Sequence, residues 1–145
     1  MPLLSRRSLL TAALVLAAAP GVGCADARGE MGAFRIPGPG LGFKVHYYVP
    51  ETAGPDAEIL FVLHGRNRDP ETYRAAWAPA ARAAGVILIA PEFDAVRFEG
   101  SRLYNLGGMQ DADGRWLPRS AWTFNYIEAA FDAFLARSGR RAQGY

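Results

Sequence analysis

The chain has 145 residues, of which 50% are hydrophobic and 21% charged, with a formal net charge of +2. This composition is typical of one globular domain and excludes a disordered, collagenous or coiled-coil protein. The 16 basic residues barely outnumber the 14 acidic ones and are scattered along the sequence, so we expect no nucleic-acid partner.

The first 27 residues, 1–27, predict a signal peptide. Arg6 and Arg7 form a basic start, Leu9 to Ala19 is apolar, and Ala25-Asp26-Ala27 offers a cleavage site between small residues. The apolar run is shorter than the roughly 20 residues that a membrane-spanning helix needs, so we expect no stable membrane span. The chain is therefore expected to be exported, to the periplasm or the extracellular space.

Two details leave the route of export open. Ser5 to Leu10 resembles a twin-arginine signal, although adjacent arginines are also common in general signals. Gly21 to Cys24 faintly resembles a lipoprotein cleavage site, but Gly21 stands where such a site has a larger aliphatic residue. Because Cys24 is the sole cysteine, the mature chain, which has 145 minus 27 or 118 residues, would contain no disulfide.

The mature chain starts with a Gly- and Pro-rich segment, 29–42, that predicts an irregular lead-in. Its Gly38-x-Gly40-x-Gly42 resembles a dinucleotide-binding loop, but such a loop follows a strand and this one precedes a strand. We therefore expect no nucleotide and no other cofactor. The run from Phe43 to Val49 is rich in β-formers and predicts the first strand.

Two fully apolar runs follow, Ile59 to Leu63 and Val86 to Ala90. Such runs are typical of strands buried on both faces of a sheet that helices cover. A helical pattern separates them, so Ile59 to Ala90 predicts one βαβ unit with parallel strands. The predicted fold class is therefore α/β.

The helix of this unit has clear end signals. Asp69 and Pro70 supply a cap and a first-turn proline, and Gly85 supplies the stop. Pro79 lies inside the pattern and should kink or split the helix.

The region after the second strand predicts a long surface loop, Arg97 to Pro118, and then a helix from Ala121 to Arg137. Asp111-x-Asp113-Gly114 in the loop resembles part of a calcium loop, but no closing Glu follows, so a plain turn is favoured. Ser120 or Thr123 is expected to cap the helix. Its expected apolar face consists of Phe124, Ile127, Phe131 and Leu135.

Ligands of open α/β sheets bind at the carboxyl ends of the strands, and two such ends are visible in the sequence. The first is His64-Gly65-Arg66-Asn67, where a Gly at the turn would let a backbone N–H point at a developing oxyanion. We expect the donor to be Arg66 or Asn67. The alternative interpretation is that His64 only satisfies backbone groups under a tight turn.

The second strand end is Glu92-Phe93-Asp94, a candidate substrate loop. Glu92 and Asp94 could form a carboxylate pair for acid–base work on sugars, because residues two apart in an extended segment point the same way. The favoured alternative is that they cap turns or pair with Arg97. With two histidines and no cysteine in the mature chain, we expect no metal site.

An ordered series of motifs resembles the N-terminal half of an α/β-hydrolase, most closely the branch of secreted esterases and polyhydroxyalkanoate-depolymerase-like proteins. The series covers about Gly42 to Tyr145. It consists of Phe61 to Pro70, Trp77, Leu88 to Asp94, Tyr104 to Gly107, Trp122 to Phe124, Ile127-Glu128 and Phe131-Asp132. The resemblance implies that residues 28–145 form the N-terminal part of an α/β-hydrolase domain.

In that family the last of these helices leads to the strand that ends in Gly-x-Ser-x-Gly with the nucleophile, and the acid and base His follow. No serine of this sequence lies in such a context, and neither His46 nor His64 can be assigned as the base. The resemblance therefore implies an oxyanion loop without a nucleophile, an acid or a base. Such a chain is expected to be inactive.

The resemblance also implies that Ile59 to Leu63 pairs with a central strand that this sequence does not supply, so an apolar edge would be exposed and the chain poorly soluble. A complementary chain is one expected partner. The leading hypothesis is a carboxylic-ester hydrolase, which in complete form acts on a small-molecule or polymeric ester. The alternative is a non-catalytic, secreted binding or interaction module on half a hydrolase scaffold, and a carbohydrate-active protein is a weaker third.

Overall fold

The computed structural model describes residues 28–38 and 42–145. The predicted signal peptide, its twin-arginine and cysteine features, and residues 39–41 of the glycine-rich segment lie outside the described residues. In the described part of the chain, no helix has both the length and the apolar character to cross a membrane.

Four strands form one mixed sheet in the order β1-β2-β4-β3. They are β1 (Gly29–Ile36), β2 (Phe43–Pro50), β3 (Ile59–Phe61) and β4 (Ile87–Pro91). β2 pairs antiparallel with both β1 and β4, whereas β3 runs parallel to β4, as the βαβ pattern predicts.

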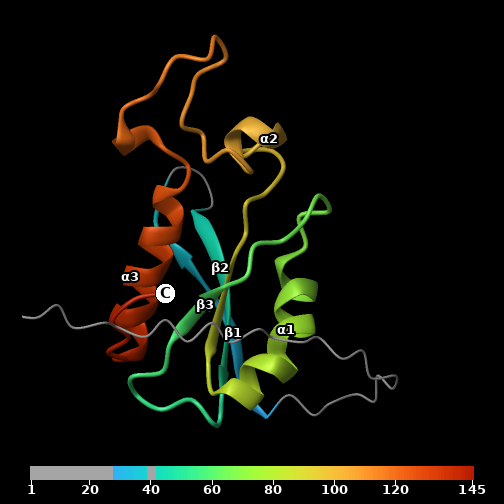
Figure 1. Cartoon of the computed structure of the whole chain (residues 1–145), viewed down its shortest axis with the longest axis vertical. Helices are drawn as coiled ribbons and strands as arrows, with labels where there is room; N and C mark the ends of the chain where they lie inside the picture. The colour runs from blue at the N-terminus through green and yellow to red at the C-terminus, as the bar shows by residue number, and fades with distance from the viewer. Residues whose placement is uncertain (1–27, 39–41) are drawn as a thin grey trace, which may run out of the picture.

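Two long helices flank this sheet, α1 (Pro70–Ala84) on one face and α3 (Asn125–Ser138) on the other (Figure 1). A short helix, α2 (Gly100–Leu103), and a 3-10 turn over Arg119–Ala121 belong to an arm that projects beyond the sheet (Figure 1). Helices on both faces of a sheet with a parallel βαβ unit make this an α/β fold.

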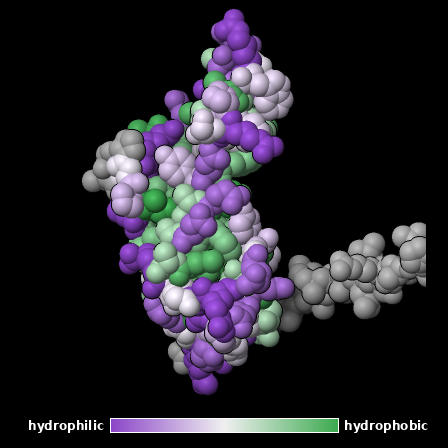
Figure 2. Space-filling view, turned by 90° about the vertical axis from the view of Figure 1, so that its left-hand side faces the viewer, coloured by the Kyte–Doolittle hydropathy of each residue, from purple (hydrophilic) through white to green (hydrophobic). Residues whose placement is uncertain are grey.

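The side chains of β4 divide the core into two layers. Ile87 and Ile89 pack on the α3 side with Phe43, Phe93 and Phe134, whereas Leu88 and Ala90 pack on the α1 side. This alternation is the two-residue period of a strand, and it explains why β4 reads as a continuous apolar run. Figure 2 shows hydrophobic residues exposed in the middle of one face, between a mainly polar arm above and a polar lower end.

The prediction of an irregular lead-in over 29–42 is wrong for its first eight residues, which form β1. This strand pairs with β2 along its whole length, from Gly29 opposite Pro50 to Ile36 opposite Phe43. Phe34 is buried and packs against Tyr47, with ring centroids 6.2 Å apart. Pairing with the next strand along the chain therefore overrides the low strand propensity of the glycines.

The α1 boundaries match the prediction. The Asp69 side chain accepts a hydrogen bond from the Thr72 N–H at 3.1 Å, and Gly85 ends the helix in the left-handed conformation with φ of 69°. Pro79 does not split the helix, which stays one element through that position.

The prediction that Ile59 to Leu63 is buried on both faces is wrong. The strand lies at the edge of the sheet, its regular part ends at Phe61, and Leu60 is 39% exposed. An edge strand has a neighbour on one side only, so its outer flank is left uncovered.

The predicted start of the last helix is also wrong. α3 begins at Asn125, neither Ser120 nor Thr123 caps it, and its fully buried positions are Ala130 and Phe134. Trp122 precedes it in an extended conformation, which breaks the helical run.

The arm before α3 contains the turn expected at Asp111. The Asp111 carboxylate accepts hydrogen bonds from the N–H groups of Asp113 and Arg115, both at 2.9 Å. Asp111 therefore closes a turn of the arm, as the favoured interpretation of this motif predicts.

Candidate active site

The predicted oxyanion loop is a tight turn at the carboxyl end of β3. The Arg68 N–H donates to the Gly65 carbonyl at 3.1 Å, which closes a four-residue turn with Arg66 and Asn67 at its corners. The residue with positive φ is Arg68, at 56°, and not Gly65. The space beside Gly65 is taken by the Tyr73 hydroxyl, which would have to shift if a Cβ were added there.

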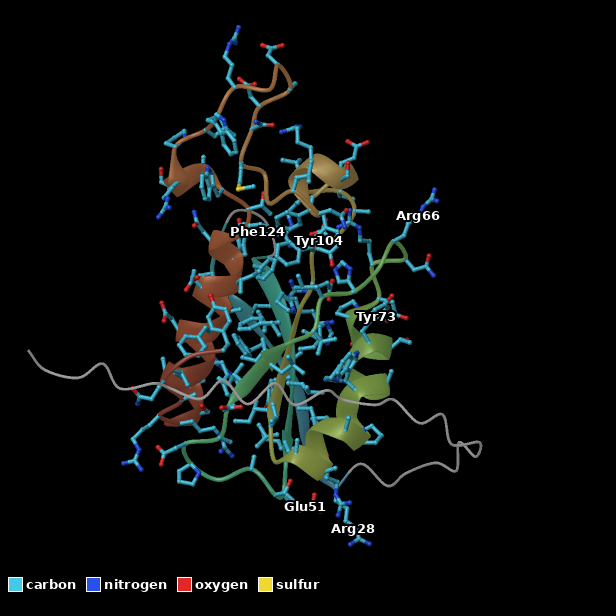
Figure 3. All side chains as sticks on the ribbon, in the orientation of Figure 1. Arg28, Glu51, Arg66, Tyr73, Tyr104 and Phe124 are labelled. Atoms are coloured by element: carbon cyan, nitrogen blue, oxygen red, sulfur yellow. The ribbon has the colours of Figure 1, made fainter. Side chains whose placement is uncertain are left out.

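The two corner residues leave their backbone donors free. Both Arg66 and Asn67 are exposed, and within residues 28–38 and 42–145 neither N–H donates to an acceptor. The Arg66 side chain points outward, away from the sheet (Figure 3). The turn therefore presents two backbone N–H groups that are available to an oxyanion.

Arg68 fixes this turn to the neighbouring loop. Its guanidinium donates to the carbonyls of Phe93 and Phe98, each at 2.9 Å, and lies 4.2 Å from the centroid of the Tyr104 ring. Two charge-assisted hydrogen bonds and a cation–π contact hold one side chain in one place. The left-handed backbone at Arg68 is thus maintained by the contacts of its own side chain.

His64 is buried under the turn, and both ring nitrogens are engaged. Nε2 accepts from the Phe93 N–H at 3.1 Å, so Nδ1 carries the proton and donates to the Gly65 carbonyl at 3.1 Å. Burial lowers the pKa of His64, which keeps the ring neutral. Such a histidine satisfies backbone groups, as the alternative interpretation of His64 states, and it offers no free nitrogen for base catalysis.

Tyr104 completes this support from the start of the arm. Its hydroxyl donates to the His64 carbonyl, and its ring stacks on the imidazole with centroids 4.8 Å apart. Burial raises the pKa of Tyr104, so the hydroxyl keeps its proton and remains a donor. His64, Arg68 and Tyr104 together tie the turn to the segment after β4.

The structure places the second predicted strand end, Glu92-Phe93-Asp94, directly beside this turn, but each side chain is engaged within the protein. Phe93 is buried in the core at 1% exposure. Asp94 accepts from the N–H groups of Val96 and Arg97 and pairs with the Arg97 side chain at 2.6 Å. Asp94 therefore caps a turn and pairs with Arg97, which is the favoured alternative for this carboxylate.

Glu92 belongs to a charged cluster that the sequence did not indicate. Its carboxylate lies 2.8 Å from His46 Nε2 and 3.4 Å from Lys44 Nζ, and Glu71 of α1 lies 3.3 Å from His46 Nδ1. Burial opposes ionisation of Glu92, but the His46 hydrogen bond and the Lys44 charge outweigh it and lower its pKa. Only the two-residue spacing of Lys44 and His46 on β2, which puts both on one face, hinted at such a cluster.

The exposed groups of the turn are hydrogen-bond donors, the kind of group that can face an anion. Among the described residues, no three His, Cys, Asp or Glu side chains are arranged to hold a metal ion. The Arg66 and Asn67 N–H groups are the free donors of the turn and could face negative charge on an oxygen, whereas the Arg68 guanidinium is engaged with the Phe93 and Phe98 carbonyls.

The comparisons with known proteins agree with this architecture. No family model and no curated protein matches the sequence. Solved structures do match, among them the following two. Poly(aspartic acid) hydrolase-1 from Sphingomonas sp. KT-1 is 36% identical over 81% of this chain and 45% of its own, with a TM-score of 0.71. The poly(3-hydroxybutyrate) depolymerase from Bordetella parapertussis is 25% identical over 76% of this chain and 39% of its own, with a TM-score of 0.63.

The chain therefore spans less than half the length of either solved structure. Over that span it shares the fold of two hydrolases, each of which is named for a polymer. The esterase- and depolymerase-like hydrolase fold that the sequence motifs predict agrees with both structures.

Proposed function

We propose that this chain provides the oxyanion-binding part of a serine hydrolase that cleaves acyl bonds, in an esterase- or depolymerase-like enzyme. The observation that carries the proposal is the turn at the end of β3, whose Arg66 and Asn67 N–H groups are exposed and unpaired among the described residues. Arg68 and Tyr104 hold that turn in place before any ligand arrives.

The chemistry follows from the position of these donors. When a nucleophile attacks an ester carbonyl, the carbonyl oxygen becomes an oxyanion, and fixed N–H donors stabilise it more than they stabilise the substrate. Loss of one such donor lowers kcat by about 10² to 10³. The neutral, buried His64 supports the turn from below and takes no part in proton transfer.

The nucleophile, acid and base are not among the residues of this sequence, because no serine lies in Gly-x-Ser-x-Gly and both histidines are engaged. We propose that residues 28–145 are the N-terminal part of an α/β-hydrolase domain behind an export signal at 1–27. A complementary segment would supply the catalytic residues. Alone, the chain would keep at most the rate enhancement that binding and an oxyanion hole give, about 10³ to 10⁴ over the reaction in water.

The proposed substrate class is a polymer with acyl linkages. Poly(aspartic acid) and poly(3-hydroxybutyrate), the polymers in the names of the two matching structures, are both built from repeated acyl bonds. Arg66 and Asn67 are exposed, and an exposed turn suits a long chain that approaches from the side.

The test joins the chain to the part of poly(aspartic acid) hydrolase-1 that lies outside the shared region. Hydrolysis of a p-nitrophenyl ester is then measured for the fusion and for the chain alone. The proposal predicts turnover by the fusion, and by the chain alone no more than the residual assistance of an oxyanion hole without a nucleophile. A correctly folded fusion that binds a poly(aspartic acid) ligand without cleaving any ester would favour the alternative, a non-catalytic binding module.

A further inference from the structure

His46 is a buried titratable side chain to which the proposed chemistry gives no role. It lies on β2, is 1% exposed, and faces the α1 side of the sheet together with Lys44 and Tyr48, which are two residues away in either direction. Both ring nitrogens of His46 face carboxylates: Nε2 lies 2.8 Å from Glu92, and Nδ1 lies 3.3 Å from Glu71 of α1. The charge of this ring therefore acts on two elements at once.

The two contacts of His46 require different numbers of protons. A neutral imidazole carries one N–H and can donate to only one carboxylate, whereas the imidazolium carries an N–H on each nitrogen. The pKa of Glu92 is lowered, so Glu92 is ionised at neutral pH and accepts from Nε2. The shorter contact, with Glu92, persists in the neutral ring. The contact of Nδ1 with Glu71 is an ion pair only while His46 is protonated.

The charges around His46 balance only in its protonated form. Lys44 Nζ lies 3.4 Å from Glu92 and 3.7 Å from Glu71, so an imidazolium and an ammonium together face two carboxylates. When the imidazolium loses its proton, one cation is left for two anions, and the hold on Glu71 weakens because Glu71 is the more exposed carboxylate. The other titratable or charged groups on the elements around His46 are Tyr48 of β2, Arg35 of β1, Asp69 and Arg74 on the α1 side, and His64 beyond Glu92.

The two segments that His46 joins are those on which the oxyanion turn depends. Glu71 is the second residue of α1 and follows the turn by three residues. Glu92 precedes Phe93, whose carbonyl accepts from the Arg68 side chain of the turn at 2.9 Å. His46 therefore connects the chain that leaves the turn with the chain that supports it.

We propose that His46 is a positioning residue for the oxyanion turn and that it acts as the imidazolium. In this form it holds the first turn of α1 to the end of β4 through Glu71 and Glu92, and the turn 65–68 stays closed. As the pH rises, the Nδ1 proton passes to water, Glu71 is released, and the turn opens more often. The inference rests on the proposed function only for the purpose of the turn, because the link itself is a property of the fold.

Nuclear magnetic resonance of the full chain, prepared without a histidine tag, tests the proposal from about pH 5 to 8, where histidines change charge. The sequence has two histidines, and the ring signals that correlate with the β2 backbone belong to His46. The Arg68 N–H donates to the Gly65 carbonyl at 3.1 Å, so its protection from hydrogen exchange, relative to the unfolded chain at the same pH, measures the closed turn. This protection should fall about two- to fivefold as the pH rises, the effect of one partly exposed ion pair, with the midpoint of the His46 ring.

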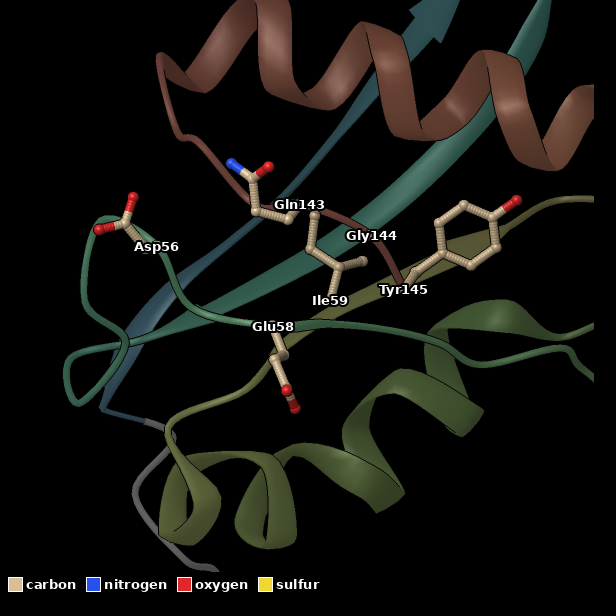
Figure 4. A pocket seen from close by; sticks show the side chains of 6 residues that line it. All are labelled: Asp56, Glu58, Ile59, Gln143, Gly144 and Tyr145. Carbon is tan, nitrogen blue, oxygen red and sulfur yellow. The ribbon is translucent and has the colours of Figure 1, made fainter. Parts of the chain in front are cut away.

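The variant Glu71→Gln separates this link from a merely structural role of His46. It keeps the shape of the side chain but removes the charge that the imidazolium faces, so the protection of Arg68 should no longer follow the titration of His46. The matched control is Glu58→Gln, which should keep the pH response. Glu58 is exposed and borders a pocket of about 560 Å³ at the start of β3, at the other end of the sheet from Glu92 (Figure 4).

Three results would overturn the proposal. They are a His46 ring that keeps one protonation state over the whole pH range, an Arg68 protection that does not follow the His46 midpoint, and an equal pH response in Glu71→Gln and the original chain. None of these results bears on the proposed hydrolase function, because turnover of the fusion at one fixed pH tests that function separately.

Discussion

Replacing Arg68 tests whether the oxyanion turn is held by the contacts of that side chain. The Arg68→Ala variant loses two charge-assisted hydrogen bonds, to Phe93 and Phe98 at 2.9 Å each, and the contact with Tyr104 at 4.2 Å. Charged hydrogen bonds contribute about 1.5 to 3 kcal/mol each, and a cation–π contact about 1 kcal/mol. Phe93 and Phe98 are buried, but water can enter the space that the truncated side chain leaves and bond to their carbonyls, so we expect a net loss of about 3 kcal/mol.

The left-handed backbone at Arg68 provides an internal check. Its φ of 56° disfavours any residue with a Cβ by about 1 to 2 kcal/mol relative to glycine. The Arg68→Gly variant loses the same contacts without that strain, so it should be more stable than Arg68→Ala by about 1 kcal/mol.

Thermal melts followed by circular dichroism, at one fixed protein concentration, measure both differences. For a chain of this size, 3 kcal/mol corresponds to a fall in Tm of roughly 12 °C. Arg66→Ala is the matched control, because Arg66 is exposed and has no partner in the described part of the chain, and it should stay within about 0.5 kcal/mol of the original. Equal melts for Arg68→Ala and Arg66→Ala would refute the idea that Arg68 anchors the turn.

Three other predictions follow from the same contacts. Burial lowers the pKa of His64, so only the unfolded chain takes up a proton at this residue near pH 6.5. The free energy of unfolding should therefore fall as the pH drops from about 6.5. The urea midpoint of the His64→Gln variant should fall less over the same pH range. The pKa of Glu92 is also lowered, so its ionised form stabilises the folded state above about pH 4.5, and this stabilisation is lost as the pH falls through the pKa of Glu92 in the folded protein. Urea midpoints at pH 7 should therefore show a loss of about 1 kcal/mol for Glu92→Gln, and this loss should shrink as the pH falls below about 4.5. Gly108→Ala should destabilise the protein by about 2 to 3 kcal/mol, since Gly108 has φ of 59° and an added Cβ would strike Thr123. The control is Gly114→Ala, because Gly114 has φ of 80° but open space around it, so only the smaller backbone cost is expected. Equal losses of stability in the two variants would contradict the steric argument.

The βαβ unit could be predicted because its signals are local. Asp69, Pro70 and Gly85 fix the ends of α1 through contacts within a few residues, and β4 is apolar on both faces. β1 could not be predicted, because it is a strand only by virtue of its pairing with β2. The apolar pattern of β3 predicted burial on both faces, since such a run does not reveal whether it lies inside a sheet or at its edge, whereas the family resemblance predicted the edge position that the structure has.

The candidate site also has a part that the sequence predicts and a part that it does not. The His64-Gly65-Arg66-Asn67 motif located the turn, because strand-end loops follow directly from the predicted strands. The support from Arg68 and Tyr104 joins segments about 36 residues apart in sequence, so no local pattern could have indicated it. The role of Gly65 was misread as well: the sequence shows that a glycine is present, but not that the Tyr73 hydroxyl needs the space.

The most direct test of the central claim removes the backbone donors from the turn. In the fusion with the part of poly(aspartic acid) hydrolase-1 that lies outside the shared region, proline at 66 or 67 deletes one N–H, whereas alanine at the same position keeps it. Arg66 is the second residue of its four-residue turn, a position that accepts proline. We predict that Arg66→Pro or Asn67→Pro lowers kcat by about 10² to 10³, while the matched alanine variants keep it. Equal kcat values for the proline and alanine variants at both positions would contradict the account.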